Sequence, residues 1–296
     1  MNSAVQSTAT TIDHLGIVAK DVAALRAAYM RLGFTVTAAT PVMQVGPDGK
    51  REIPLGQITA HIAFPSTCLE LIAVRHPGQG SHLDKWLARH EGLHVIALHA
   101  DDAMQAAMEL QAAGLILPPM RASSRRINGE GVKGTARFKW FELPDSIARE
   151  GFAYVVQHET PELVFDPRLT AHANGATGIR SVFAVVQNMD DAFGRYQRLP
   201  RTTRRSFAIG RTIIMNQQEF VVVEKTGFAA MFPGLDIPPP PHLGGFALTV
   251  TDIAATRSML TKAGIYFQNW GENGVWVPPE DAGGTVLAFV DQRAPL

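Results

Sequence analysis

The segment IDHLGIVAKD, residues 12–21, followed by VAALRAAYMRLGF, residues 22–34, predicts a strand that leads directly into a helix. Residues 12–20 alternate apolar and polar positions as a half-buried strand does. Asp21 stands where a helix N-cap is expected, and apolar residues then recur at helical spacing as far as Gly33, a typical residue for ending a helix. This stretch therefore reads as one strand and one amphipathic helix.

The same pattern returns eighty residues later as GLHVIALHADD, residues 92–102, followed by a helical stretch that ends at Gly114. In this alignment His14 corresponds to His94, and Asp21 corresponds to Asp101. Internal repeats are sought first because they determine the fold.

Two weaker copies follow. The segments GIRSVFAVVQNMDDAFGRYQRL, residues 178–199, and GGFALTVTDIAATRSMLTKAGI, residues 244–265, keep only the hydrophobic pattern and the helix punctuation. Short β-like runs follow each helix, such as ITAHIAF and TCLELIAV after the first. The repeating unit is therefore predicted to be βαβββ. Such a unit has one apolar face, so copies should pair around a shared cavity.

Loops rich in Pro, Gly and polar residues separate the later units, at residues 167–178 and 233–245. We therefore expect an α+β protein of four modules in two halves, 1–170 and 171–296.

Composition restricts the possible functions. The 296 residues carry 27 Lys+Arg and 27 Asp+Glu, so no overall charge favours nucleic acid or an anionic membrane as a partner. Cys68 is the only cysteine, which excludes a disulfide framework within the chain and a zinc site made of several cysteines. The N-terminal stretch has no signal-peptide pattern and no segment has membrane-helix length. We expect a cytoplasmic protein that binds a small-molecule substrate and that could form a homodimer.

The module pattern resembles the glyoxalase-like proteins of the vicinal oxygen chelate superfamily. The resemblance rests on IDHLGIVAKD, on LGF at the helix end, on CLELIAV and on GLHVIALHADD. It implies that paired modules form U-shaped sheets whose concave face holds a divalent metal ion (Fe, Mn, Zn or Ni). It also implies ligands from the first and fourth strands, which are His14, Glu70 and His94.

The residues themselves support this metal site. A carboxylate within the apolar run CLELIAV would be costly to bury without a cation or another partner. Two imidazoles and one carboxylate suit a divalent ion. The alternative for the three residues is two hydrogen-bonded core histidines and a carboxylate at a solvated strand edge.

The fourth ligand position departs from a full glyoxalase set. Aligning GFAYVVQHET with TCLELIAV places Tyr154 opposite Glu70, and a shifted register offers Gln157 or His158. With Tyr154 there, two His and one carboxylate remain, as in non-haem Fe(II) oxygenases. In the C-terminal half, Ser181, Gly245 and Ala288 occupy the corresponding ligand positions.

Other residues are candidates for catalysis or substrate contact. His61 could serve as a general base, and Tyr154 and His158 share one strand face that could line the pocket. His99 is expected to face away, and the stretch with Arg121, Arg125 and Arg126 reads as a loop, either solvated or clamping an anion.

Three functions follow. The first is a metal-dependent lyase or isomerase of the glyoxalase type, in which the metal chelates vicinal oxygens of the substrate. The second is an Fe(II) ring-cleaving dioxygenase. The third is a non-catalytic, ligand-sequestering protein of the bleomycin-resistance type, which needs no metal.

Overall fold

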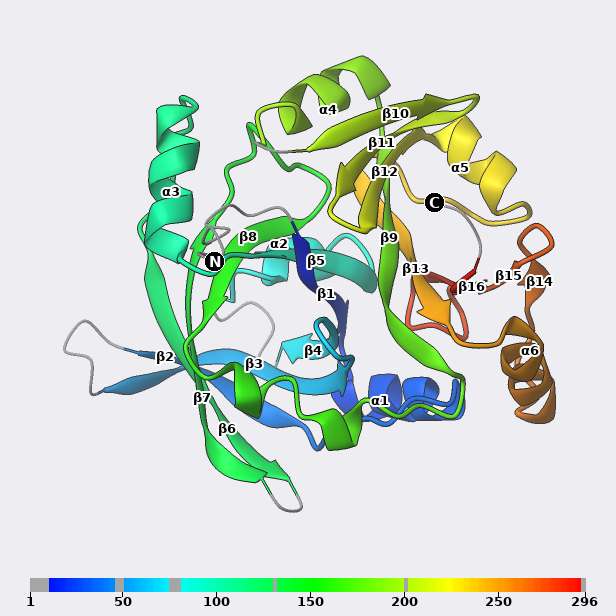
Figure 1. Ribbon diagram of the computed structural model, residues 1–296, viewed down its shortest axis with the longest axis horizontal. Helices are drawn as coiled ribbons and strands as arrows, with labels where there is room; N and C mark the ends of the chain where they lie inside the picture. The colour runs from blue at the N-terminus through cyan, green and yellow to red at the C-terminus, as the bar shows by residue number, and fades with distance from the viewer. Residues whose placement is uncertain (1–10, 46–50, 75–80, 130–131, 200–201, 294–296) are drawn as a thin grey trace, which may run out of the picture.

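A computed structural model describes residues 11–45, 51–74, 81–129, 132–199 and 202–293. Residues 1–10, which hold most of the stretch on which the expectation of no signal peptide rests, lie outside this range. The described residues build two eight-stranded mixed sheets with helices packed against them, an α+β architecture (Figure 1).

The first sheet contains two successive strand–helix–three-strand units. The elements of the first unit are β1 (Thr11–Ala19), α1 (Val22–Arg31), β2 (Thr40–Val45), β3 (Glu52–Ala63) and β4 (Cys68–Val74). After the short helix α2 (Asp84–Leu87), the second unit comprises β5 (Gly92–His99), α3 (Ala103–Ala112), β6 (Arg121–Gly129), β7 (Val132–Glu142) and β8 (Phe152–His158). The strand order is β1-β4-β3-β2-β6-β7-β8-β5, and the sheet closes into a barrel.

The second sheet repeats the arrangement without closing. Two 3₁₀ turns, η1 (Pro161–Leu163) and η2 (Pro167–Leu169), lead into it. Its first unit consists of β9 (Ala176–Val186), α4 (Met189–Tyr196), β10 (Thr203–Phe207), β11 (Gly210–Met215) and β12 (Gln218–Glu224), followed by α5 (Lys225–Met231). The last unit consists of β13 (His242–Val250), α6 (Ile253–Lys262), β14 (Gln268–Asn269), β15 (Gly274–Val277) and β16 (Val286–Asp291). The order is β10-β11-β12-β9-β13-β16-β15-β14.

The helices begin and end for the local reasons that the sequence indicates. The Asp21 carboxylate accepts hydrogen bonds from the backbone N–H groups of Ala23 and Ala24 at 2.7 and 3.2 Å, which satisfies two of the free donors at the start of α1. Gly33 has a φ of +86°, a conformation that favours glycine, just beyond the end of that helix. The helix-capping residues therefore recur along the chain together with the helical spacing of apolar residues.

Barrel closure corrects the expectation of two open, U-shaped sheets. The closing seam lies between β2 and β6, where Val42, Met43 and Gln44 pair with Arg125, Ser124 and Ser123. The segment around Arg125 is thus a strand and not a loop. Only the second sheet is open. Strands of the closed barrel therefore form most of the pocket wall in the first half, and His82, Leu83 and Val164 line it from outside the strands.

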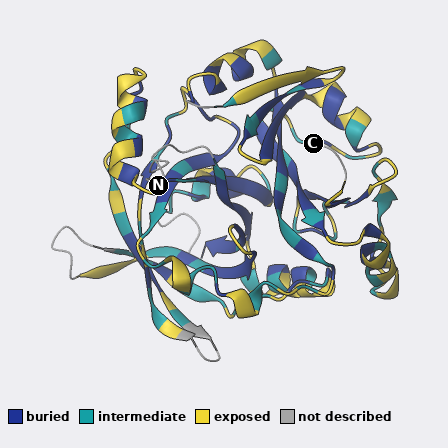
Figure 2. Cartoon of the chain, in the orientation of Figure 1, coloured by how far each residue is buried: buried dark blue, intermediate teal, exposed yellow. Residues whose placement is uncertain are grey.

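A continuous core connects the two sheets. Phe34 of the first half stacks on Phe289 of the second, with ring centroids 6.1 Å apart. The Gln218 side chain accepts a 2.7 Å hydrogen bond from Ile12 N–H and donates one of 3.1 Å to Ile12 C=O. Figure 2 shows buried residues running through both sheets, with exposed residues on the outer faces of the helices. The division at residue 170 remains a prediction, because this core is shared.

Among the described residues, no helix is both long enough and apolar enough to cross a membrane.

Candidate functional site

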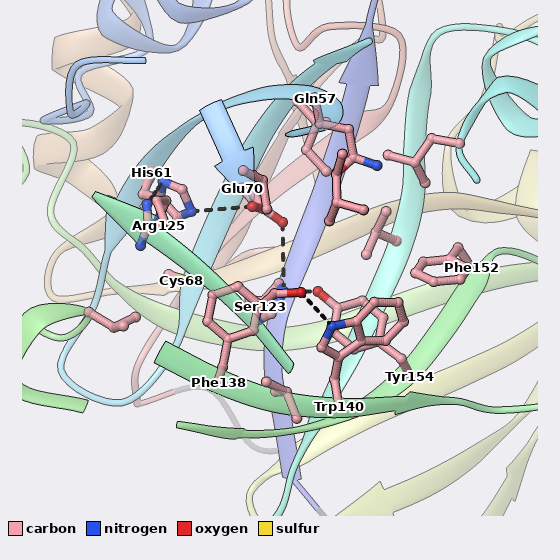
Figure 3. A pocket seen from close by; sticks show the side chains of 18 of the residues that line it. Gln57, His61, Cys68, Glu70, Ser123, Arg125, Phe138, Trp140, Phe152 and Tyr154 are labelled. Atoms are coloured by element: carbon pink, nitrogen blue, oxygen red, sulfur yellow. Dashed lines mark hydrogen bonds and ion pairs between the residues drawn. The ribbon is translucent and has the colours of Figure 1, made fainter. Parts of the chain in front are cut away.

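The barrel of the first half contains a pocket of about 750 Å³, its open mouth included. Its walls are mostly aliphatic and aromatic, and its polar groups gather on a few strands. Figure 3 shows His61 and Arg125 at one end, Glu70 in the middle, and Trp140, Tyr154 and Phe152 at the other end. An apolar cavity with a few convergent polar groups is the usual form of a small-molecule site.

His14 enters the site from β1, beside an irregularity in that strand. The register between β1 and β5 shifts between Ile12 and His14, so Asp13 is an extra residue at a β-bulge. The Asp13 carboxylate is 1 % exposed and lies 2.6 Å from His14 Nδ1. Because a carboxylate only accepts hydrogen bonds, Nδ1 of His14 carries a hydrogen and donates a hydrogen bond to Asp13. This leaves Nε2 of His14 directed at the pocket.

The Asp13 carboxylate also contacts the imidazoles of His158 and His99. Nε2 of His158 lies 3.0 Å from Asp13 Oδ1, and Nδ1 of His99 lies 3.2 Å from Oδ2. Burial alone would raise the pKa of Asp13, but His158 and the hydrogen bonds from the three histidines hold it well below its ordinary value. Asp13, His14 and His158 form a candidate metal site, since one ligand atom from each lies within 4.8 Å of the others.

On the pocket side, His14 Nε2 lies 2.6 Å from the Tyr154 hydroxyl and 3.8 Å from Glu70 Oε2. Burial, together with the nearby Glu70 and Asp13 carboxylates, raises the pKa of Tyr154 well above its ordinary value, so the phenol stays protonated. Burial lowers the pKa of His14, yet the hydrogen bond and charge of Asp13 outweigh it and the net shift is upward. The chain Tyr154–His14–Asp13 is therefore a buried hydrogen-bonded relay.

Arg125, His61 and Glu70 form a second chain of polar contacts in the pocket. His61 Nε2 lies 3.3 Å from Glu70 Oε1, and an Arg125 N–H donates to His61 Nδ1. A guanidinium cannot accept a hydrogen bond, so Nδ1 of His61 carries the lone pair that accepts from Arg125. Nε2 then carries the hydrogen and can donate to Glu70. Arg125 thereby selects one tautomer of His61.

The electrostatics agree with this tautomer. Burial and the neighbouring Arg125 lower the pKa of His61 to about 4, so the ring is neutral at neutral pH. Burial would raise the pKa of Glu70, but the His61 hydrogen bond and the charges around it bring the value to about 2. Glu70 is therefore a carboxylate across the physiological range. A general-base role for His61 remains a prediction, and both of its nitrogens are engaged in this structure.

His94 is not brought to the pocket. It is fully buried on the other side of β5, where Nε2 donates to the His90 carbonyl at 2.7 Å. Its ring packs on His90, with centroids 4.3 Å apart.

The reason is a one-residue error in the repeat alignment. The cap of α3 is Asp102 and not Asp101, and α1 and α3 begin at Val22 and Ala103, a separation of 81 residues and not 80. The structural partner of His14 is therefore Val95, which lines the pocket. A shift of one residue turns a strand side chain to the opposite face.

The fourth-strand alignment agrees with the structure. β1 pairs Gly16 with Glu70, and β5 pairs the corresponding Ala97 with Tyr154. Gln157 accepts a hydrogen bond from Ala103 N–H at 3.0 Å instead of joining the pocket. His158 does line the pocket, and it also contacts Asp13.

The sequence analysis missed one site residue, Asp13, although a carboxylate inside an apolar strand needs a partner as much as Glu70 does. Arg125 was named as a possible anion clamp but was expected in a loop, whereas it lies on β6. His99, expected to face away, reaches Asp13 at the strand end. Cys68 also lines the pocket, and burial raises the pKa of its thiol well above its ordinary value, which fits an inert thiol.

In the described part of the second sheet, the positions that match His14 and Glu70 carry neither a histidine nor a carboxylate. Ser181 donates to Glu219 at 3.1 Å, and Val221 and Ala288 stand where Glu70 stands in the first unit, judged by their pairing with β9 and β13. Val221 and Ala288 belong to an apolar cluster that includes Phe228 of α5. From the missing ligands in its sequence we expect the second half to be a scaffold, a lid or a dimer surface, and this role remains a prediction.

Paired βαβββ units around a pocket with a few convergent polar groups define the vicinal oxygen chelate class of protein. Residues 12–200 match the family described as a glyoxalase-like domain, and the chain belongs to that family.

Solved structures agree on the fold. A hypothetical protein from Staphylococcus aureus superposes with a TM-score of 0.64 at 10% identity, over 95% of this chain and 99% of that one. A Mn(II)-bound glyoxalase from Novosphingobium aromaticivorans gives 0.56 at 14% identity, over 96% and 83%. A xylose isomerase-like TIM barrel/4-hydroxyphenylpyruvate dioxygenase fusion protein gives 0.57 at 12% identity, over 100% of this chain and 51% of that one. No curated protein matches the sequence.

Proposed function

We propose that this protein is a metal-dependent, glyoxalase-like enzyme of the lyase or isomerase type. It binds one divalent ion in the barrel pocket and a small oxygen-rich substrate that chelates that ion. The observation that carries the proposal is the convergence of His14 Nε2, the Glu70 carboxylate and the Tyr154 hydroxyl on the pocket side of β1.

The donor set fits a divalent ion. Nδ1 of His14 donates a hydrogen bond to the buried Asp13 carboxylate, the arrangement that usually orients a ligating imidazole. The 3.8 Å between His14 Nε2 and Glu70 Oε2 can be bridged by one ion, because protein ligand bonds of about 2.0–2.2 Å span up to about 4 Å between two ligand atoms. Tyr154 is close enough to act as a third ligand or to release His14 and donate to substrate.

The Asp13 side of His14 offers a second arrangement. Asp13, His14 and His158 have the two-His, one-carboxylate composition that is typical of non-haem Fe(II) oxygenases, and this composition keeps a dioxygenase as the second candidate function. Their atoms, however, already lie at hydrogen-bond distances of 2.6 and 3.0 Å. An ion between them would have to replace both of these bonds, whereas an ion on the pocket side would replace one, between His14 and Tyr154, so we favour the pocket side.

A bound divalent ion would supply Lewis-acid polarisation of the substrate oxygens. The chain supplies the rest. His14 and Glu70 hold the site, and Asp13 fixes the direction of His14. The protonated Tyr154 hydroxyl can donate to a substrate oxygen, while the neutral His61 keeps Glu70 oriented. The apolar walls exclude water and so strengthen each of these interactions.

Metal content tests the proposal. Protein purified without a His tag, stripped with chelator and dialysed against Mn(II), Fe(II), Zn(II) or Ni(II) should retain one ion per chain for at least one of these metals, measured by elemental analysis. Mn(II) comes first because a structural neighbour is a Mn(II)-bound glyoxalase. Glu70→Gln and His14→Asn should each weaken binding by at least about tenfold.

Two variants serve as controls. His94→Asn should keep full stoichiometry, because His94 lies outside the pocket, and loss of metal in it alone would restore the sequence-based ligand set. His158→Asn should also keep the metal if the ion sits on the pocket side, whereas its loss would move the ion to the Asp13 side.

Oxygen dependence separates the enzyme classes. A lyase or isomerase works anaerobically with several divalent ions, while a dioxygenase consumes O₂ and needs Fe(II) or Mn(II). A chain that retains none of the four metals would be the ligand-sequestering protein instead.

A further inference from the structure

Arg125 presents a buried positive charge to the pocket. It lies on β6, its side chain lines the pocket, and the residue is 8 % exposed. One N–H donates to His61. A guanidinium has five N–H donors in a fixed planar fork, so the group can bind a further acceptor.

The charge balance around Arg125 depends on the proposed function. His61 lies between Arg125 and Glu70, with its Nε2 3.3 Å from Glu70 Oε1, so Glu70 is the carboxylate that faces Arg125 across that ring. A divalent ion bound to Glu70 would be offset by the negative charge of the same carboxylate. The pocket would then hold an excess of positive charge in an apolar surrounding, which is costly unless an anion enters.

The opposite end of the pocket has another character. Trp140, Phe152 and Tyr154 form a group of contacting rings, with centroids 5.3–6.1 Å apart. Trp140 N–H donates to Ser123 at 2.9 Å, so the indole is held in place. His82 also lines this end and packs on Phe152, with ring centroids 4.5 Å apart. A ligand with an anionic group at one end and an apolar or aromatic body at the other therefore matches the pocket (Figure 3).

We propose that Arg125 binds the carboxylate of the substrate, which is a small monocarboxylic acid with an apolar or aromatic body. A planar guanidinium pairs with a carboxylate through two parallel hydrogen bonds. Arg125 is the one Arg or Lys among the described residues that line the pocket, and its remaining N–H donors can pair with the two oxygens of a carboxylate. This inference rests on the proposed metal site and assigns the substrate class of that same pocket.

Calorimetric titration of the Mn(II)-loaded protein tests it, with phenylacetate, the neutral phenylacetamide and benzylphosphonate as probes. Phenylacetate should bind at least about tenfold more tightly than the amide, as expected for a hydrogen bond to a charged group. Equal binding of acid and amide overturns the proposal. So does tighter binding of the phosphonate, or no binding of any probe at millimolar concentration.

Variants assign the effect to Arg125. Arg125→Met should abolish the preference for the acid, and Arg125→Lys should retain part of it. Arg126→Met is the matched control, because Arg126 is the exposed neighbour on the same strand. If Arg126→Met loses the preference as well, the effect is not specific to the pocket.

Two readouts keep the conclusions separate. A thermal melt of each variant checks folding, and the acid–amide comparison in the unmodified protein needs no variant. Protein that takes up metal without preferring the acid refutes only the role of Arg125. Protein that takes up no metal refutes the proposed function.

Discussion

Glu150 is a fully buried carboxylate that joins the barrel to helix α4 of the second half. Arg195 Nη2 donates to its Oε1 at 2.6 Å, and the Tyr196 hydroxyl and the Arg149 N–H, the latter at 3.0 Å, donate to its Oε2. The Arg195 side chain is itself only 10 % exposed. We predict that Glu150→Ala is among the most destabilising single changes outside the apolar core.

The magnitude follows from what the substitution leaves behind. Removing one partner of a buried ion pair costs about 3–5 kcal/mol, because the remaining charge is desolvated without compensation. Arg195 keeps two acceptors, the Ile147 carbonyl at 2.6 Å and Asp191 at 3.2 Å. We therefore expect the lower end, about 3 kcal/mol, and a fall in Tm of roughly 6–10 °C.

The assay is urea unfolding of four proteins: unmodified, Glu150→Ala, Arg195→Met and the double variant. The double variant should lose about 2 kcal/mol less than the sum of the single changes, because the second substitution removes the orphaned charge. Glu159→Ala, which breaks an exposed pair with Lys139, is the control and should cost less than about 1 kcal/mol. Additivity of Glu150→Ala and Arg195→Met within about 0.5 kcal/mol would refute the reasoning.

Three further predictions concern the site and its surroundings. Asp13→Asn should weaken Mn(II) binding about 10–100-fold in a dialysis titration while Tm stays within a few degrees, because the imidazole of His14 loses its orienting carboxylate; unchanged affinity would contradict this. Val95→His should tighten Mn(II) binding in the same titration, since Val95 is the structural partner of His14, and weaker binding would argue against the 81-residue repeat. Burial first, then neighbouring positive groups, lower the pKa of His94 and His242 to about 4. The free energy of unfolding that they contribute is therefore complete above pH 6.5 and falls, by roughly 2–3 kcal/mol per residue, as the pH drops towards 4; a doubly substituted His94→Asn, His242→Asn protein with the same pH profile as the unmodified one would contradict it.

Much of the fold could be read from the sequence because it is recorded locally. Asp21 and Gly33 mark the two ends of a helix through backbone chemistry, and the same punctuation recurs at Asp252 and Gly264. Barrel closure could not be read in this way. It depends on how far β2 and β6 curve toward each other, which no short pattern records.

The site was predicted in part, and the errors have physical causes. His14 and Glu70 stand out as polar residues in apolar strands, and the structure places them 3.8 Å apart. His94 was misplaced because two aspartates, 101 and 102, compete for one cap position, and only the backbone decides between them. Arg125 was misread because polar residues that line a pocket from inside a barrel look like a loop.

The seam between β2 and β6 closes the barrel at the strand that carries Arg125. Three residues on each strand pair there, and Arg125 is one of them, facing Val42. Any opening at this seam would carry the guanidinium away from His61 and loosen the grip on a bound acid at the same moment. A substrate held by Arg125 would thus be bound by a residue that also belongs to the pairing that closes the barrel.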